Sequence, residues 1–492
     1  MMHLSNKIWA VTAAVWWAVA SGCAVGPNFK PPAAPATDNY TAAPLSAETA
    51  SAPGPAGASQ RLVPGREIPA EWWALFHSEK LGELIRQAVA NNPSLAAAAA
   101  TLRASQENLR ALVGSALIPS VNADASVSRQ KISGAAFGQP EKDFSPFTLY
   151  NASVSITYAL DLFGGARREL EALQSEADYA GFLLEGAYLA ITSNIVTAAV
   201  KEAALRAQID ATLEIIAAEE KQLEVVSRQF QLGAVAKTDV LAQRAQLSQT
   251  RATLPPLEKA LSQTRHLLAV LAGRPPGEAA ALPEFTLNGF DLPPEVPVSL
   301  PSDLVRQRPD IRAAESLMHA ASARIGVATA ALLPRITLSG SYGSEAVSSG
   351  ALFTSGAGIW NLGAGLLQPL FHGGELTARR RAAAAVYDQA AEQYRAAVLQ
   401  AFQNVADVLR ALDLDATALK AQAEAEEASR ALFELAVRQF QLGAISYLSL
   451  LNAERQEKEA RIGLVQAQAL RLADTAALFQ TLGGGWWNRV KQ

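Results

Sequence analysis

The chain has 492 residues, a formal net charge of −4 at neutral pH, hydrophobic residues at half of its positions and one cysteine. A single cysteine excludes an internal disulfide, and the absence of a basic tract argues against nucleic-acid binding. Much of the hydrophobic content is alanine, which favours helices and lets them pack closely. We therefore expect long packed helices rather than a bulky globular core.

Residues 1–22 have the features of an export signal. Lys7 precedes an apolar run over residues 8–20 that is too short to span a bilayer. Three small residues then precede Cys23, which resembles the lipobox of bacterial lipoproteins, where the mature chain begins at a lipidated cysteine. That resemblance implies a diacylglycerol and an acyl chain on Cys23, and Ala24 after it favours the outer membrane. The alternative is an ordinary signal peptide with an incidental cysteine.

The segment from residue 23 to residue 70 is rich in Pro, Ala, Gly, Ser and Thr and has few large apolar residues. Such a composition buries too little surface to offset the entropy lost on ordering. We expect a flexible tether here. Beyond the export signal, we expect no helix apolar enough to span a membrane.

An internal duplication organises the rest of the chain. The sequence RQFQLGA occurs at residues 228–234 and again at residues 438–444. Two further pairs keep the same order, because ALIP is echoed by ALLP and LFGG by LFHGG. The expected parts are a first repeat at 71–272, a Pro-rich link at 273–301, a second repeat at 302–482 and a tail at 483–492.

Each repeat begins with a helix and two strands. Helices are predicted at 81–117, with a corner at the Asn-Asn-Pro sequence, and from 302 to about 333. Apolar residues then alternate with small polar ones, a period-two pattern that suits the wall of a membrane barrel or, alternatively, an antiparallel sheet on a soluble core. Two strands per repeat cannot close a barrel alone. The predicted strands are 121–128, 151–160, 336–342 and 360–366.

A very long helical hairpin follows the strands in each repeat. Residues 165–232 contain hardly a helix breaker, and such a helix is about 100 Å long. Gly233 marks a turn, and a helix returns over residues 238–271, with Pro255 and Pro256 at an expected kink. The second hairpin runs from 374 to 442, turns at Gly443 and ends near 482. Neither compact domains nor soluble cores need helices of this length.

The chain resembles the TolC and OprM group of outer-membrane efflux channels, and within this group it resembles the NodT-type lipoproteins. The likeness covers essentially all of the mature chain. It depends on CAVGPNF from Cys23, the Trp72-Trp73 start, LPSDLVRQRPDIRAAE from Leu300, IGVATAALLP from Ile325 and LGGGW from Leu482.

The resemblance implies a mixed α and β membrane protein that is internally duplicated and forms a homotrimer. Four strands from each chain would close a twelve-stranded β-barrel in the outer membrane, and the helices would continue it as an α-helical barrel across the periplasm. Closure would remove the sheet edges that lipid cannot solvate. The protein would then be a lipid-anchored outer-membrane channel-tunnel that exports small molecules.

The same resemblance implies partners rather than cofactors. A periplasmic adaptor protein of an inner-membrane pump, expected to be of the RND type, would dock on the hairpin tips at 231–237 and 441–447. No cofactor is expected other than the acyl groups on Cys23. The positions assigned to docking or to the turns are Arg228, Leu232, Gly233 and Ala234 in the first hairpin and Arg438, Leu442, Gly443 and Ala444 in the second.

Members of the group carry acidic residues that ring a constriction just inside the tips. The matching positions here are Asp239 in the first hairpin and Ser449 and Asn452 in the second. Because Ser and Asn replace the Asp common in relatives, we expect a polar ring with less charge repulsion and weaker cation binding. This departure puts the usual cation-selective gate in question.

Three other functions remain open on the sequence alone. An enzyme is disfavoured, since the five histidines are scattered and no metal, nucleophile-elbow or phosphate-loop motif is present. A periplasmic coiled-coil lipoprotein without a pore would leave the two-faced strands unused. A TolC-like exit duct for type I protein secretion keeps the channel and changes the cargo.

Overall fold

The computed structural model describes residues 24–33, 39–41, 46–133, 135, 138 and 141–489. The chain divides into two compact units, each assembled from three separate segments. The sheet unit comprises residues up to 32, 101–180 and 314–394, and the hairpin unit comprises 33–100, 181–313 and 395–492. Each unit is described separately.

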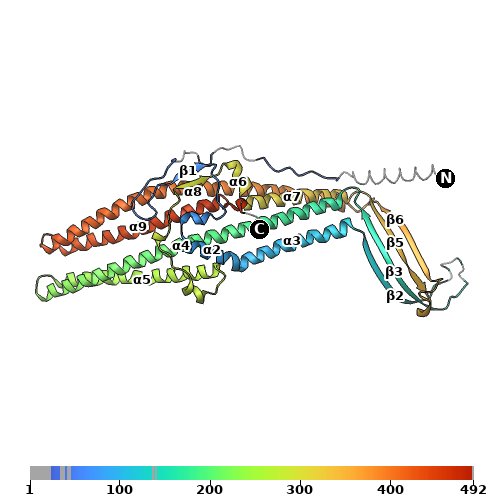
Figure 1. Cartoon of the computed structure of the whole chain (residues 1–492), viewed down its shortest axis with the longest axis horizontal. Helices are drawn as coiled ribbons and strands as arrows, with labels where there is room; N and C mark the ends of the chain where they lie inside the picture. The colour runs from blue at the N-terminus through green and yellow to red at the C-terminus, as the bar shows by residue number, and fades with distance from the viewer. Residues whose placement is uncertain are drawn as a thin grey trace. The chain divides into compact units, whose positions relative to one another are not determined.

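The sheet unit is built on one four-stranded antiparallel sheet with the strand order β2-β3-β5-β6 (Figure 1). The β3–β5 pairing joins the two repeats, so the duplicated strand pairs form one continuous sheet. All four predicted strands are confirmed. Their bounds are β2 at Ser120–Gln130, β3 at Phe147–Leu160, β5 at Arg335–Ala346 and β6 at Gly358–Leu367.

One face of this sheet is apolar and uncovered by the chain. Val154 pairs with Tyr342, and Tyr342 pairs with Trp360, so a row of large apolar side chains crosses three strands. Tyr342 and Trp360 are each 73% exposed. The outer strands β2 and β6 have free edges within the sheet and are exposed along their whole lengths. An apolar face and two open edges both require partners outside the chain.

The two helical hairpins have identical lengths, as a duplication predicts (Figure 1). α4, at Gly165–Gln231, and α8, at Glu375–Gln441, each have 67 residues. The returning helices α5, at Lys237–Leu271, and α9, at Tyr447–Thr481, each have 35 residues. α5 continues through Pro255 and Pro256 as a single helix.

The remaining elements precede the strands or lie in the Pro-rich link. The predicted helix at 81–117 is present as two helices that meet at Asn92, and the predicted helix from 302 is also two. Arg308 is extended, with ψ at 125°, because a residue before proline is driven out of the helical region. The bounds are β1 Arg61–Pro64, η1 Trp72–Phe76, α2 Glu79–Asn91, α3 Pro93–Leu117, η3 Pro276–Ala281, η4 Leu287–Gly289, β4 Glu295–Val298, α6 Pro301–Gln307, α7 Pro309–Ala330, η5 Ser349–Ala351 and η6 Trp486–Asn488.

The hairpin unit has an aromatic core beside the end of α9. Trp72 stacks on Phe479 with ring centroids 5.3 Å apart, and Phe76 meets the same phenylalanine edge-on at 6.5 Å. All three side chains are fully buried. The burial of this cluster fixes the start of the first repeat against the last helix of the second repeat.

Two expectations from the sequence are corrected here. Residues 46–64 are not a loose tether: β1 pairs in parallel with β4, and the buried Gln60 hydrogen-bonds to Thr475 at 3.3 Å. Also, among the described helices, α4 contains a segment of 18 residues with a mean hydropathy of 1.4, apolar enough to cross a membrane by length and composition. Half of that segment is buried in the chain, and the buried face of a helix is made of apolar side chains.

Candidate functional site at the hairpin ends

The first hairpin ends in a glycine turn whose geometry follows from its sequence. Gly233 has a φ of +77°, which glycine adopts without strain. Its N–H donates to the Phe230 carbonyl at 2.9 Å, and the Ala234 N–H donates to the Gln229 carbonyl at 2.9 Å. These two bonds satisfy carbonyls that the end of α4 would otherwise leave without partners.

The second hairpin repeats this turn bond for bond. Gly443 has a φ of +70°, its N–H reaches the Phe440 carbonyl at 2.9 Å, and Ala444 reaches Gln439 at 2.9 Å. A Cβ added at Gly233 or Gly443 would meet no atom within 4 Å. Backbone conformation rather than space therefore demands glycine at both positions.

Both turns present apolar and cationic side chains to solvent. Leu232 is 78% exposed and Leu442 is 84% exposed, far more than a leucine needs at a simple helix end. Arg228 and Arg438 are exposed as well, and no ion pair joins either to a residue in the described part of the chain. The eight residues assigned to the tips thus fall on two matching surfaces.

A single apolar cluster lies beneath the two tips. Its buried members come from α4, α8 and α9, so the two hairpins are packed together at their ends rather than only paired within themselves. Val235 and Ile445, from the two turns, pack against this cluster. The buried members are Val226, Ala436, Tyr447, Leu450 and Ala453.

The residues assigned to the gate lie at the starts of the two returning helices. Asp239 accepts a hydrogen bond from the Ala236 N–H at 3.1 Å, which forms half of a capping box, since Ala236 has no side-chain acceptor. Ser449 occupies the equivalent place in α9, where its N–H donates to Oγ of Ser446 at 3.2 Å. Asn452 is exposed one turn later. Asp239 therefore helps to begin α5, whereas the side chain that caps α9 is Ser446, to which Ser449 donates its backbone N–H.

The sequence analysis missed a buried polar network just behind the tips. Glu219 of α4 is fully buried, and its Oε1 accepts from the Thr250 hydroxyl at 2.9 Å. Lys458 of α9 donates to the same hydroxyl at 2.6 Å. Gln243 donates to the Glu219 carbonyl at 3.2 Å and accepts from the Tyr447 hydroxyl. Three helices are joined by these contacts.

A second carboxyl on α9 faces this network. Glu454 is 5% exposed. Burial and the nearby Glu219 carboxylate raise the pKa of Glu454 to about 7, although the attraction of Lys458 opposes this shift. Within the described residues, Oε2 of Glu454 and Oε2 of Glu219 have no hydrogen-bond partner. A buried, unpartnered carboxylate is costly, so the junction favours protonation of Glu454.

One assigned residue, Cys23, lies outside the described residues, which begin at Ala24.

A two-faced sheet with open edges and a pair of helical hairpins with matching tips are together typical of a membrane channel subunit. The model of the outer membrane efflux protein family matches residues 84–274 and 300–484. The chain belongs to the outer membrane efflux protein family. It is therefore an outer-membrane efflux channel protein, and the expected fold class of mixed α and β membrane protein is confirmed.

Named relatives and solved structures agree with this family. The pyoverdine export outer membrane protein OpmQ of Pseudomonas putida is 32% identical over 426 residues, which cover 84% of this chain and 88% of that protein. The toluene efflux pump outer membrane protein TtgC of Pseudomonas putida is 29% identical and covers 96% of this chain and 95% of its own. The structure of the outer-membrane channel OprN has a TM-score of 0.84 at 29% identity, over 94% of this chain and 100% of that one.

Proposed function

We propose that three copies of this chain close one barrel and form the exit duct of a tripartite efflux system. The observation that carries the proposal is the sheet itself: β2 and β6 have free edges, and one face is apolar and uncovered. In a bilayer every backbone polar group needs a partner, and closure with neighbouring copies supplies it. Four strands per chain and three chains give the twelve strands that we expect.

The hairpin tips are the docking surface of this duct. A periplasmic adaptor would contact the exposed Leu232 and Leu442 and the two arginines, Arg228 and Arg438. Two equivalent tips per chain offer such an adaptor six similar sites around a trimer. The pump behind the adaptor, expected to be of the RND type, would supply the energy, and this protein would conduct without catalysing a reaction.

Small molecules are the proposed cargo. The names of related outer-membrane proteins refer to pyoverdine export and to pumps for toluene, antibiotics and solvents, which are all small compared with a protein. The polar face of the sheet supports a wide solute range, because Ser, Thr, Asn and Gly dominate it and form no selective pocket. Selection of the cargo would belong to the pump.

Two local assignments complete the proposal. Cys23 carries the lipid anchor, and Ala24 after it directs the chain to the outer membrane. Asp239, Ser449 and Asn452 line the closed end of the duct, where three copies of each would form a weakly charged ring. The positions of Asp239 and Ser449 are compatible with this, because both residues lie in the first turns of the returning helices, next to the tips.

The oligomer and its conductance test the proposal directly. Native mass spectrometry of the detergent-extracted protein should give three copies, and reconstitution in a planar bilayer should give discrete conductance steps. In cells lacking the gene, accumulation of small dyes and antibiotics should rise, and export of proteins should not change. A monomeric product without conductance would support the coiled-coil lipoprotein instead, and lost protein export would support type I secretion.

A further inference from the structure

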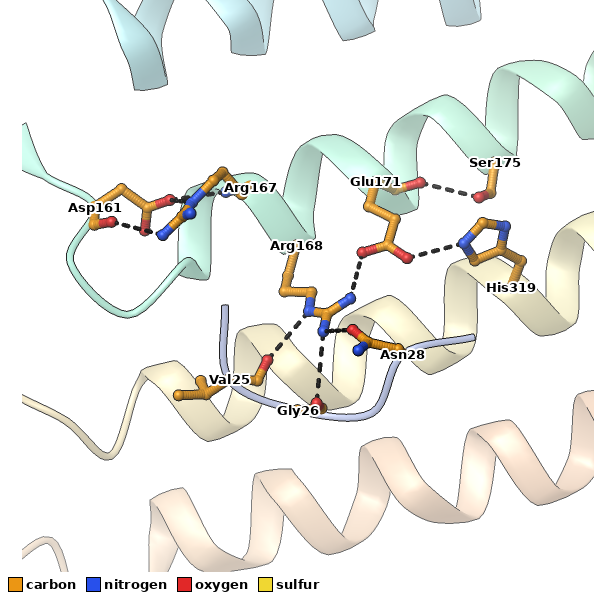
Figure 2. Close-up of polar contacts among 9 residues, drawn as sticks. All are labelled: Val25, Gly26, Asn28, Asp161, Arg167, Arg168, Glu171, Ser175 and His319. Carbon is orange, nitrogen blue, oxygen red and sulfur yellow. Dashed lines mark hydrogen bonds and ion pairs between the residues drawn. The ribbon is translucent and has the colours of Figure 1, made fainter. Parts of the chain in front are cut away.

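A buried arginine on α4 holds the first described residues of the chain. Arg168 is 5% exposed. Its Nε donates to the Val25 carbonyl at 3.1 Å, and its Nη2 donates to Oδ1 of Asn28 at 2.6 Å and to the Gly26 carbonyl at 3.5 Å. Figure 2 shows the guanidinium pointing from α4 onto this extended segment. One side chain thus satisfies three acceptors of a segment about 140 residues away in sequence.

A carboxylate and a histidine hold the arginine in place. Glu171 accepts from Nη1 of Arg168 at 2.6 Å, and Nε2 of His319 on α7 lies 2.9 Å from its other oxygen. Burial opposes ionisation of Glu171, but the bonds from Arg168 and His319 outweigh it and lower the pKa of this carboxyl. An ionised carboxylate only accepts, so the hydrogen lies on the histidine nitrogen.

Close packing completes the surface that receives residues 24–29, which we call the seat. The His319 ring stacks on Phe29, with centroids 4.3 Å apart and planes 12° apart. A Cβ added at Gly26, whose φ is +96°, would lie 2.4 Å from Cα of Gly326 on α7. At the other end, a Cβ at Gly164 would lie 2.5 Å from Cα of Ala24. Gly26, Gly164 and Gly326 therefore allow the segment to lie directly on the backbones of α7 and of the turn before α4.

The seat holds Ala24 and Val25 beside the junction between β3 and α4. The Val25 N–H donates to the Phe163 carbonyl at 3.0 Å, between the end of β3 at Leu160 and the start of α4 at Gly165. Ala24 therefore lies beside the end of a membrane strand. Under the proposed lipidation of the preceding cysteine, the lipid is attached next to this point.

We propose that residues 24–29 are a docking strap and that Arg168 is the positioning residue that seats it, so that the lipid anchor enters the membrane at a fixed point beside β3. The strap binds its seat through its own contacts, independently of the lipid. The part that concerns the lipid rests on the proposed lipidation of Cys23, and the seat itself does not. Three residues of the sequence GPNF thereby acquire a physical reason: Gly26 for close approach, Asn28 for Arg168 and Phe29 for His319.

A spin label at position 30, directly after the strap, tests the seat. Cys23 is the chain's one cysteine, so with Cys23→Ser behind an ordinary cleavable signal peptide, Lys30→Cys provides a single site for a nitroxide. In the folded oligomer we expect an immobilised spectrum. Arg168→Gln should shorten the label's correlation time roughly tenfold, towards the nanosecond motion of a free terminus. Gly26→Ala, which damages the opposite side of the seat, should do the same.

A matched control lies on α7. Arg324 forms an ion pair with Glu176, so Arg324→Gln should leave the label immobile. Each variant is compared at equal oligomer yield and equal circular dichroism, which separates release of the strap from unfolding. A mobile label with Arg168 intact, or an immobile label in both Arg168→Gln and Gly26→Ala, would overturn the proposal.

Mass spectrometry of the protein with its native Cys23 tests the lipid anchor separately from the seat. An unmodified cysteine there would refute the proposed lipid anchor, and the label at position 30 would still report on the seat. With lipid present, Arg168→Gln should again release the strap. A label that becomes mobile only when the lipid is removed would show that the lipid, and not Arg168, holds the strap.

Discussion

The Tyr447 hydroxyl donates a hydrogen bond to Oε1 of Gln243 and thereby joins the second hairpin to the first. Gln243 is fully buried and Tyr447 is 6% exposed, so neither group exchanges this partner for water while the hairpins are closed. The Gln243 side chain in turn donates to the Glu219 carbonyl on α4 at 3.2 Å. Movement of either hairpin tip away from the other would break this chain of bonds.

Removing the hydroxyl should loosen the tips. Tyr447→Phe leaves Oε1 of Gln243 buried without a partner, which costs about 1–3 kcal/mol. We expect faster hydrogen exchange in the first turns of α5 and α9 and a larger share of open-channel events in planar bilayers. The double variant Tyr447→Phe with Gln243→Leu removes both partners and should recover most of the loss. Unchanged exchange in Tyr447→Phe would show that the bond does not hold the tips.

The turn glycines should be sensitive through backbone conformation alone. Gly233→Ala or Gly443→Ala forces a side chain into the left-handed region, at a cost of about 1–2 kcal/mol each. Thermal unfolding should detect the loss at both sites. Gly277→Ala is the control, because a Cβ there also meets nothing within 4 Å and Gly277 does not have a positive φ. Equal effects at all three positions would contradict this account.

The hairpin junction should weaken as the pH rises. An ordinary glutamic acid loses its proton near pH 4.5, whereas burial, opposed only in part by Lys458, raises the pKa of Glu454 to about 7. The folded state therefore binds the proton more tightly than the unfolded state, and the stabilisation present below pH 4.5 is lost as the pH rises through 7. The difference is on the order of 3 kcal/mol. The charged groups facing Glu454 are Glu219, Glu457 and Lys458.

Glu454→Gln is the variant that checks this dependence. Its neutral amide should make the hairpins more stable at pH 8 than the native chain and nearly equal at pH 4.5, as measured by thermal unfolding. Glu459→Gln, exposed on the same helix, serves as the control. A native stability that rises between pH 5 and 8, or a Glu454→Gln variant with the native pH profile, would refute the assignment.

The proposed gate predicts a gain of selectivity. Ser449→Asp would place three carboxylates in the ring of a trimer and would still suit the start of α9, because Asp239 occupies the equivalent place in α5. Reversal potentials in a salt gradient should then shift towards cation preference. Ser449→Ala adds no charge and should leave the potential unchanged. The assignment fails if Ser449→Asp does not alter selectivity in channels that open.

Adjacent residues on β6 test which face of the sheet meets lipid. Leu362 is 79% exposed on the apolar face, and Leu362→Arg should cost about 2–4 kcal/mol if it lies near the bilayer midplane. Asn361 pairs with Ser341 on the opposite face, so Asn361→Arg should be tolerated. Urea unfolding from lipid vesicles measures both. If Asn361→Arg proved more destabilising than Leu362→Arg, the face that carries Asn361 would be the one that meets lipid.

Much of the fold was predictable because its signals are local. The alternation of Val121, Ala123 and Ala125 with polar residues gave the strand without any knowledge of its neighbours. Gly233 and Gly443, each at the end of a long unbroken helix, gave the turns for the same reason. Because of the duplication, the elements of the second half could be predicted from those of the first half.

What could not be predicted depends on contacts between distant segments. Gln60 reads as a loop residue until Thr475, 415 residues later, supplies its partner. Arg168 looks like any exposed residue near a helix start until residues 25–28 fold onto it. Glu219 has no sequence signal at all, because buried and exposed glutamates are alike in one chain. The break at Arg308 was missed although its cause is local, because Pro309 drives the residue before it out of the helical region.

In-cell photo-crosslinking from the hairpin tips tests the central claim most directly. A photoreactive residue would replace Ala234 or Ala444, with Glu278, exposed in η3, as the control position. The account predicts that a periplasmic adaptor is trapped from both tips and not from position 278. If neither tip traps an adaptor in cells where the oligomer is assembled in the outer membrane, docking at the tips is contradicted.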